Sequence, residues 1–192
     1  MRVNNYSLLF YMSFFTSDKF TDDMVMFNIL EGIDFYSGTE RKTMLKVAKG
    51  NGSMLWGNTW KGFLAWRDGE KIYRKKDPKC KGKYLTKVKA ENPELEQVFS
   101  EYADKYFGGF QYAQVQMNKN FPCPPHTDKN KGESVCVAFG DYEGGLLCLE
   151  TEVGIKKFDS RITPTRFDGY KYKHWVEPFT GGTRYSLVYF SN

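Results

Sequence analysis

The sequence predicts an α+β fold that is mainly β, an antiparallel sandwich or jelly roll with at least one helix packed on a sheet. Short apolar or alternating runs, separated by turn residues about every 8–12 positions, fill the C-terminal half. One amphipathic helical pattern stands directly before them. Aromatic residues make up 17% of the chain, and such rings favour strands and large cores.

The length of 192 residues indicates a single domain, residues 1–192, with a core of its own. No repeat, low-complexity block or linker rich in proline and serine divides it. Within this domain, we expect residues 1–109 to supply N-terminal strands, a basic segment and a supporting helix. Residues 110–192 should form the β-rich core.

The first apolar run, Leu8 to Phe15, has the character of a buried strand. It is too short to span a bilayer. Only Arg2 precedes it and no small-residue cleavage site follows, so a signal peptide is disfavoured. We therefore expect no membrane association. Further on, Gly50-Asn51-Gly52 predicts a turn.

A basic stretch, residues 71–89, follows a cluster of tryptophans. Aromatic rings beside cations can stack bases and neutralise phosphates, which predicts a nucleic-acid partner. The alternative is that the rings anchor the core and the lysines coat a loop or an edge strand. The residues proposed for nucleic-acid contact are Lys71, Arg74, Lys75, Lys76, Lys79 and Lys81, with Trp56, Trp60 and Trp66.

The clearest helix covers residues 92–107. Asn92 is suited to cap it and Pro93 to occupy its first position. Gly108-Gly109 should end it. The apolar residues recur at helical spacing and should face a sheet. They are Leu95, Val98, Phe99, Tyr102 and Tyr106.

From residue 110 the pattern is typical of strands. Gly140 to Gly145 has the composition of a hairpin connection, and Asp168-Gly169 that of a tight turn. The expected strands are residues 110–117, 134–139, 146–150, one or two within 158–167, and 185–190.

The cysteines indicate a reduced compartment. There are four, Cys80, Cys123, Cys136 and Cys148, and none forms a CxxC pair. A chain of this length with few cysteines is typical of an intracellular protein, cytoplasmic or nuclear, although an even count also permits two disulfides.

Only two histidines occur in the chain, and both stand in a pattern typical of a metal site. His126 and Asp128, two apart on an extended segment, should point to one face. His174 would join them from a remote strand. Two imidazoles and one carboxylate form the facial triad of non-haem Fe(II) sites, and this set suits a borderline divalent metal better than magnesium or calcium.

With Arg184-x-Ser186 added, the motif His126-x-Asp128…His174 resembles the signature of the Fe(II)/2-oxoglutarate-dependent dioxygenases. The resemblance covers roughly residues 110–192. It implies a double-stranded β-helix (jelly-roll, cupin-like) and Fe(II) bound by His126, Asp128 and His174. It also implies 2-oxoglutarate as co-substrate, with Arg184 and Ser186 at its distal carboxylate, and O2. A planar guanidinium suits a carboxylate bidentately.

Two asparagines near the motif are candidate binding residues. Tyr112, Gln114, Gln116 and Asn118 should share one strand face, and the resemblance implies that Asn118 contacts the oxo acid. The alternative is a solvated polar face. Asn130, just after the ligand pair, should either order the loop or touch the substrate.

The substrate is less strongly indicated. Blocks such as Gly140-Asp141-Tyr142-x-Gly144-Gly145 resemble small members of the TET and J-base-binding-protein branch from algae and large viruses. This likeness implies oxidation of a nucleobase, of 5-methylcytosine or thymine type, in DNA or RNA. The alternative is a peptide or small-molecule hydroxylase, although prolyl 4-hydroxylases typically carry a lysine where Arg184 stands. A remote alternative is a binding module without activity. The oligomeric state stays open.

Overall fold

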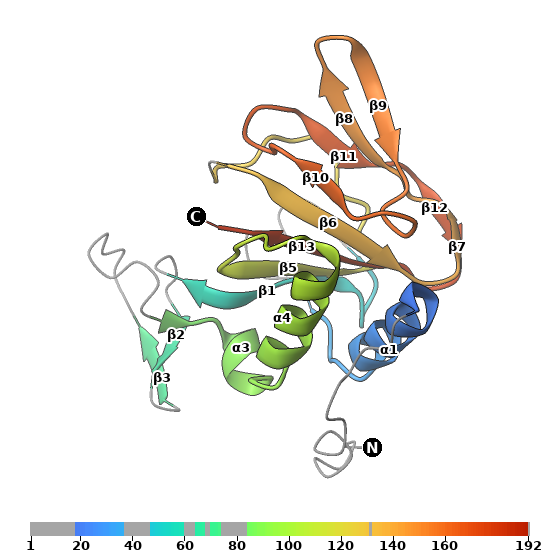
Figure 1. The fold of residues 1–192 in the computed structure, drawn as a ribbon. Coiled ribbons are helices and arrows are strands. Elements are labelled where there is room, and N and C mark those ends of the chain that lie inside the picture. The colour runs from blue at the N-terminus through green and yellow to red at the C-terminus, as the bar shows by residue number, and fades with distance from the viewer. Residues whose placement is uncertain are drawn as a thin grey trace.

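The computed structural model describes residues 18–36, 47–59, 64–67, 70–73, 84–130 and 132–191. The strand predicted over Leu8 to Phe15 lies outside these residues. The described part is mainly antiparallel β structure with helices on one face of the largest sheet, as Figure 1 shows. The predicted α+β, mainly β class is therefore correct.

Three helices lie in the described part of the chain: α1 (Lys19–Glu31), α3 (Lys87–Glu91) and α4 (Leu95–Tyr106). The strands of the N-terminal half are β1 (Gly52–Thr59), β2 (Leu64–Arg67), β3 (Glu70–Tyr73) and β4 (Tyr84–Leu85). Those of the C-terminal half are β5 (Gln114–Lys119), β6 (Ser134–Phe139), β7 (Tyr142–Gly144), β8 (Leu147–Thr151), β9 (Gly154–Phe158), β10 (Thr165–Phe167), β11 (His174–Val176), β12 (Phe179–Gly181) and β13 (Tyr185–Phe190).

The largest sheet joins the two halves of the sequence. Its strand order is β10-β6-β13-β5-β1-β4-β2-β3, and all its pairs are antiparallel. The chain-terminal strand β13 lies between β5 and β6, and β1 continues the sheet beyond β5. A three-stranded sheet, β11-β8-β9, and a two-stranded one, β12-β7, complete the β structure.

The central strands have two different faces, because side chains alternate along a strand. On β13, Leu187 and Tyr189 are fully buried in the core beneath α1 and α4. Ser186 and Val188 point the other way and line a pocket. The helices therefore cover one face of the sheet and leave the other to the pocket.

The predicted helix over residues 92–107 is confirmed as α4, but its expected cap is wrong. Asn92 instead ends α3, where its Nδ2 donates to Val88 O at 3.0 Å. Glu94 stands at the N-terminus of α4 and makes no capping hydrogen bond through its side chain. Because α3 ends just before α4 begins, the Asn92 side chain bonds to the last turn of α3 and does not cap α4. The glycines after α4, Gly108 and Gly109, have φ of 56° and 76°.

Helix α1 was not predicted, because its apolar residues do not form one stripe. Phe20 and Met24 are exposed while Met26 and Leu30 are buried. Its start does carry a readable signal, since Asp18 accepts hydrogen bonds from the backbone N–H groups of the first turn.

Two strand predictions need correction. Gly140 to Gly145 is not a hairpin connection, because β6 and β8 belong to different sheets and residues 142–144 form β7, which pairs with β12. Strand β5 begins at Gln114 rather than at residue 110. Tyr112 precedes it and packs its ring on Tyr189, on the helix side, so it does not share a face with Gln114. Strands β6 and β13 are confirmed over the predicted residues.

None of the described helices has the length and apolar character needed to cross a bilayer. Of the four cysteines, Cys123, Cys136 and Cys148 lie in the described part of the chain, and all three are free thiols.

Candidate metal centre

The two histidines come together through their backbones. His126 N donates to His174 O at 3.0 Å, and His174 N donates to His126 O at 2.8 Å. This isolated antiparallel bridge joins the loop after β5 to the first residue of β11. The two imidazole ring centres lie 4.3 Å apart. Residues 48 positions apart in the sequence are thus fixed side by side.

Both imidazoles are oriented by carbonyl groups of the backbone. Nδ1 of His126 lies 2.8 Å from Pro124 O, and Nδ1 of His174 lies 3.0 Å from Tyr172 O. A carbonyl can only accept, so each Nδ1 carries a proton and each Nε2 is turned away from the backbone, toward Asp128. Such a second hydrogen bond on a ligating histidine is the usual arrangement around a protein-bound metal.

The Asp128 carboxylate lies between the Nε2 atoms of the two histidines. Its Oδ1 is 3.5 Å from His126 Nε2 and its Oδ2 is 3.6 Å from His174 Nε2. One ligand atom from each of the three residues lies within 4.8 Å of the others. Ligands bound at about 2 Å and at right angles are on the order of 3 Å apart, so small side-chain rotations would let the three share one ion.

Gly169 makes this approach of the three groups feasible. Asp128 N donates to Gly169 O at 2.8 Å, which holds the carboxylate beside the glycine. A Cβ on Gly169 would lie 2.4 Å from Asp128 Oδ2 and 3.1 Å from His174 Cε1. The sequence predicted Asp168-Gly169 as a turn, and Asp168 Oδ1 does accept from the backbone N–H groups of Tyr170 and Lys171. The closeness of Gly169 to the triad was not predicted.

The metal-free triad holds a proton strongly. Burial opposes the charged form of His126, but hydrogen bonding to the Asp128 carboxylate, assisted by the Cys123 thiol and the Pro124 carbonyl, raises the pKa of His126 to about 10. The Cys123 sulfur lies 3.6 Å from His126 Nδ1. A positive charge is therefore favoured where the three side chains meet, as a cation-binding site requires.

Arg184 is fully buried and lies directly behind Ser186. Its Nη1 donates to Ser186 Oγ at 3.2 Å and its Nη2 to Gly145 O at 3.3 Å. Among the described residues it forms no salt bridge, and its Nε has no hydrogen-bond partner. A Cβ on Gly145 would lie 2.9 Å from Arg184 Nε, so the glycine leaves room for the guanidinium. In the sequence, Gly145 indicated only a turn.

Asn118 belongs to the same hydrogen-bond network. Its Nδ2 donates to Ser186 Oγ at 3.2 Å, and its Oδ1 accepts from Ser53 Oγ at 2.5 Å. Gln116 Nε2 donates in turn to Ser53 Oγ at 2.9 Å. Polar side chains of β1, β5 and β13 are therefore joined to one another on the pocket face. They do not form a plain solvated strand face.

These groups surround one pocket that opens to solvent. Its polar lining includes the triad, Asn118 and Ser186, while Arg184 stands one layer behind the wall. The rest of the lining is largely apolar: Phe121, Leu147, Phe167, Trp175, Val176, Val188 and Phe190. A concave, mainly apolar site with a few convergent polar groups is typical of small-molecule binding.

Of the residues predicted for nucleic-acid contact, only Trp56 is described with its side chain, and it does not line this pocket. Trp56 is 2% exposed and packs edge-on against Phe99, so its ring is a core anchor and has no free face for a base. That part of the prediction is wrong. Arg74, Lys75, Lys76, Lys79, Lys81 and Trp60 lie outside the described residues, as do the side chains of Lys71 and Trp66.

No family model and no curated protein sequence matches this chain. Among solved structures, a 2OG-Fe(II) oxygenase family oxidoreductase from Burkholderia pseudomallei is similar at 18% identity and a TM-score of 0.40, over 55% of this chain and 59% of that one. NgTET1 in complex with 5mC DNA is similar at 19% identity and a TM-score of 0.36, and the alignment covers 80% of this chain and 64% of that one. A Pseudomonas putida prolyl-4-hydroxylase is similar at 16% identity and a TM-score of 0.33, and the alignment covers 53% of this chain and 63% of that one. Each alignment spans less than two thirds of the solved chain.

Proposed function

We propose that this protein is an Fe(II)- and 2-oxoglutarate-dependent dioxygenase that hydroxylates a C–H bond. The observation that carries the proposal is the meeting of His126, Asp128 and His174 in a pocket that also presents Ser186, backed by the buried Arg184. We infer further that residues 1–192 act as one domain, whose sheets form a double-stranded β-helix around the pocket.

The three triad side chains would hold the metal and leave the remaining octahedral positions to ligands. When bound, Fe(II) supplies the O2-dependent oxidising chemistry, coupled to conversion of 2-oxoglutarate into succinate and CO2. The backbone carbonyls of Pro124 and Tyr172 keep both Nε2 atoms aimed at the ion.

Ser186 and Arg184 would seat the far carboxylate of the diacid. Ser186 Oγ already accepts from Arg184 Nη1 and Asn118 Nδ2, which leaves its own O–H proton to donate into the pocket. The guanidinium has no carboxylate partner among the described side chains, so its charge is available to an incoming anion. Asn118 acts here by orienting Ser186, which refines its predicted contact with the oxo acid.

The decisive experiment measures succinate formed from 2-oxoglutarate by the purified protein with Fe(II) and no other substrate. We expect slow, metal-dependent turnover that His126→Ala or Asp128→Ala abolishes. Exposed Glu143 on β7 offers a control, Glu143→Ala, which should keep the wild-type rate. Full turnover by either triad variant with added iron would refute the proposal. Failure of the wild-type protein to bind Fe(II) and 2-oxoglutarate would favour a binding module without activity.

A second measurement separates the diacid site from the metal site. With Mn(II) in place of Fe(II), Ser186→Ala should weaken 2-oxoglutarate binding by about tenfold, since a hydrogen bond to a charged group contributes about 1.5–3 kcal/mol. Binding of Mn(II) alone should stay at the wild-type level. A loss of Mn(II) affinity in Ser186→Ala would contradict this division of roles.

Within this proposal, the oxidised C–H bond belongs to a nucleobase of DNA or RNA. The support is the basic segment 71–89, which follows a run of aromatic residues. Joint replacement of Arg74, Lys75 and Lys76 by glutamine should weaken oligonucleotide binding and flatten its salt dependence. An unchanged salt slope would place the contact elsewhere. A screen of oligonucleotides, peptides and metabolites for a mass gain of one oxygen tests the alternative, a peptide or small-molecule hydroxylase.

A further inference from the structure

Asn130 carries a buried hydrogen-bond donor that nothing in the described structure satisfies. The residue is only 9% exposed, and its Nδ2 has no partner among the described residues. Its side chain lines the same pocket as the triad. A buried donor without an acceptor destabilises the folded state by about 1–3 kcal/mol, so such a group calls for a ligand that supplies the acceptor.

The loop that carries Asn130 is anchored at both ends. Asp128, before it, is hydrogen bonded to Gly169, and Ser134, after it, pairs with Phe167 at the start of β6. The lining of the same pocket also includes three aromatic residues, Phe167, Trp175 and Phe190. The pocket therefore combines an unsatisfied donor with flat apolar groups that suit a planar ligand.

The pocket lining extends along β13 from Ser186 to Phe190, and Asn130 precedes the first residue of β6 by four positions. On β13, Ser186 pairs with Ala138 near the end of β6, whereas Tyr189 pairs with Val135 near its start. Ser186 and Phe190 are four residues apart, or roughly 13 Å along a strand. A five-carbon diacid extends roughly 7 Å with ordinary bond lengths. A diacid seated on Ser186 therefore leaves the end nearest β6's first residue to a second ligand.

We propose that Asn130 is a specificity-determining residue that donates its Nδ2–H to a carbonyl oxygen of the oxidised substrate. The group recognised is a planar amide, as found in a nucleobase ring or in a peptide, held against Phe190 and Trp175. This inference rests on the proposed function for the division of the pocket between co-substrate and substrate. It assigns to the asparagine a ligand contact in preference to loop ordering.

The first test needs no ligand. Asn130→Leu keeps the side-chain shape but removes the unsatisfied donor, so the ligand-free variant should unfold at an equal or higher temperature than the wild-type protein. Asn92 is the matched contrast, because its Nδ2 is bonded to Val88 O. Asn92→Leu should unfold at a lower temperature. A clear fall in the unfolding temperature of Asn130→Leu would show that Asn130 orders the loop, for example through a bound water, and would overturn the proposal.

The second test uses two small amide probes, 1-methylthymine and N-acetylprolinamide, on protein loaded with Zn(II) and 2-oxoglutarate. One of them should shift the Asn130 side-chain amide signals in ¹⁵N-resolved NMR spectra, and its identity distinguishes nucleobase from peptide. Asn130→Leu should weaken that probe about tenfold, whereas Ser186→Ala should weaken 2-oxoglutarate. If neither probe moves the Asn130 signals, the proposal fails. Failure of the wild-type protein to bind 2-oxoglutarate would instead refute the proposed function. Binding of the two amide probes would then be measured on protein without metal.

Discussion

At the scale of single residues, the site depends on two glycines whose lack of a side chain leaves room for functional groups. Gly169 and Gly145 each lie where a methyl group would collide with a functional side chain, Asp128 in one case and Arg184 in the other. Neither glycine supplies chemistry. Both allow a charged group to reach a position that it could not otherwise occupy.

Gly169→Ala should therefore weaken metal binding by about tenfold or more, the range found when groups that orient metal ligands are changed. The new methyl must displace the Asp128 carboxylate or His174. Titration with Mn(II) or Co(II) measures the effect. Gly32→Ala is the control, since a Cβ there meets only Ile29 O at 3.4 Å. Equal metal affinity in both variants would show that Asp128 moves without consequence.

The raised pKa of His126 predicts how the metal-free protein responds to pH. Its pKa is about 10 in the folded state against the ordinary 6.5, so between these values the folded protein holds more of this proton than the unfolded chain. The resulting stabilisation is complete below pH 6.5 and is lost as the pH rises through 10. Urea unfolding in EDTA should show stability falling over this interval.

Asp128→Asn is the informative control for this pH effect, because it removes the carboxylate that raises the pKa of His126. The decline of stability between pH 6.5 and 10 should become shallower in this variant. A wild-type profile that is no steeper than that of Asp128→Asn would contradict the assignment.

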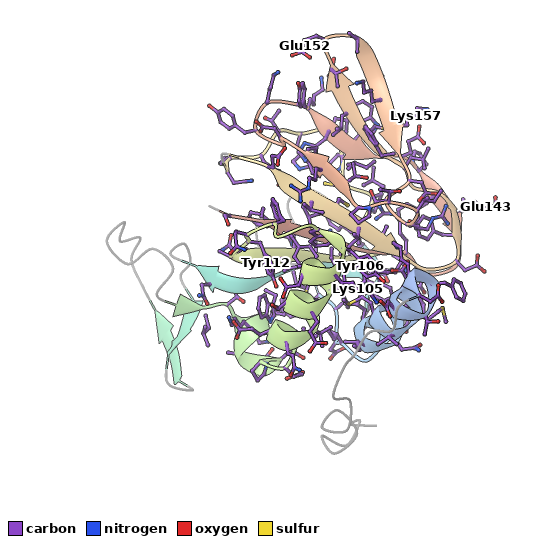
Figure 2. All side chains as sticks on the ribbon, viewed as in Figure 1. Lys105, Tyr106, Tyr112, Glu143, Glu152 and Lys157 are labelled. Carbon is purple, nitrogen blue, oxygen red and sulfur yellow. The ribbon has the colours of Figure 1, made fainter. Side chains whose placement is uncertain are left out.

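At the scale of elements, α1 and α4 are joined by a polar network at the edge of an apolar core. Asp22 of α1 is fully buried and accepts hydrogen bonds from Lys105 and Tyr106 of α4. Asp23 accepts from Tyr102 at 2.6 Å. Figure 2 shows Lys105 and Tyr106 at the end of α4 that lies next to α1. The network fixes which turn of one helix meets which turn of the other.

Asp22→Ala should lower the free energy of unfolding by about 2 kcal/mol, because it leaves the Lys105 ammonium and the Tyr106 hydroxyl without their shared acceptor. Denaturant unfolding measures the change. Asp104 lies on the exposed side of α4, and Asp104→Ala should shift stability by less than about 0.5 kcal/mol. Similar losses in the two variants would show that the buried network contributes nothing specific.

At the scale of the whole molecule, the two faces of the largest sheet have different roles. Its helix-covered face holds the main core, and its other face lines the pocket. Residues of β8 and β11, in the three-stranded sheet, line the same pocket. The β8–β9 hairpin projects outward with Glu152 near its tip (Figures 1 and 2). The largest sheet includes β1 from the N-terminal half, so stability and site geometry depend on both halves of the chain.

This division predicts opposite effects for neighbours on β13. Leu187→Ala, on the helix-covered face, should destabilise the protein by about 2–5 kcal/mol and leave 2-oxoglutarate binding to the folded protein largely intact. Val188→Ala, on the pocket face, should affect stability less and alter 2-oxoglutarate binding more. Denaturant unfolding and 2-oxoglutarate binding, measured on both variants, test this prediction. Equal stability losses would show that the two faces are not energetically distinct.

The patterns that could be read directly were local ones. Periodicity located helix α4, and short apolar runs located strands β6 and β13. The chemistry of the motif was also readable, since two histidines, one aspartate and one arginine at such spacing leave few other roles. The Asn92 cap was misplaced because a preceding helix was not predicted, and the role of Trp56 depended on Phe99, which is distant in the sequence.

By itself, then, the sequence determined the mainly β class and the principal helix, and it supplied the set of side chains that we propose for a metal and a diacid. Only the tertiary structure decided that these side chains meet, that Gly169 makes room for Asp128, and that Arg184 stands behind Ser186. The physical reason is that periodicity and residue type act over a few positions, whereas contacts such as the His126–His174 bridge arise only when remote strands pair.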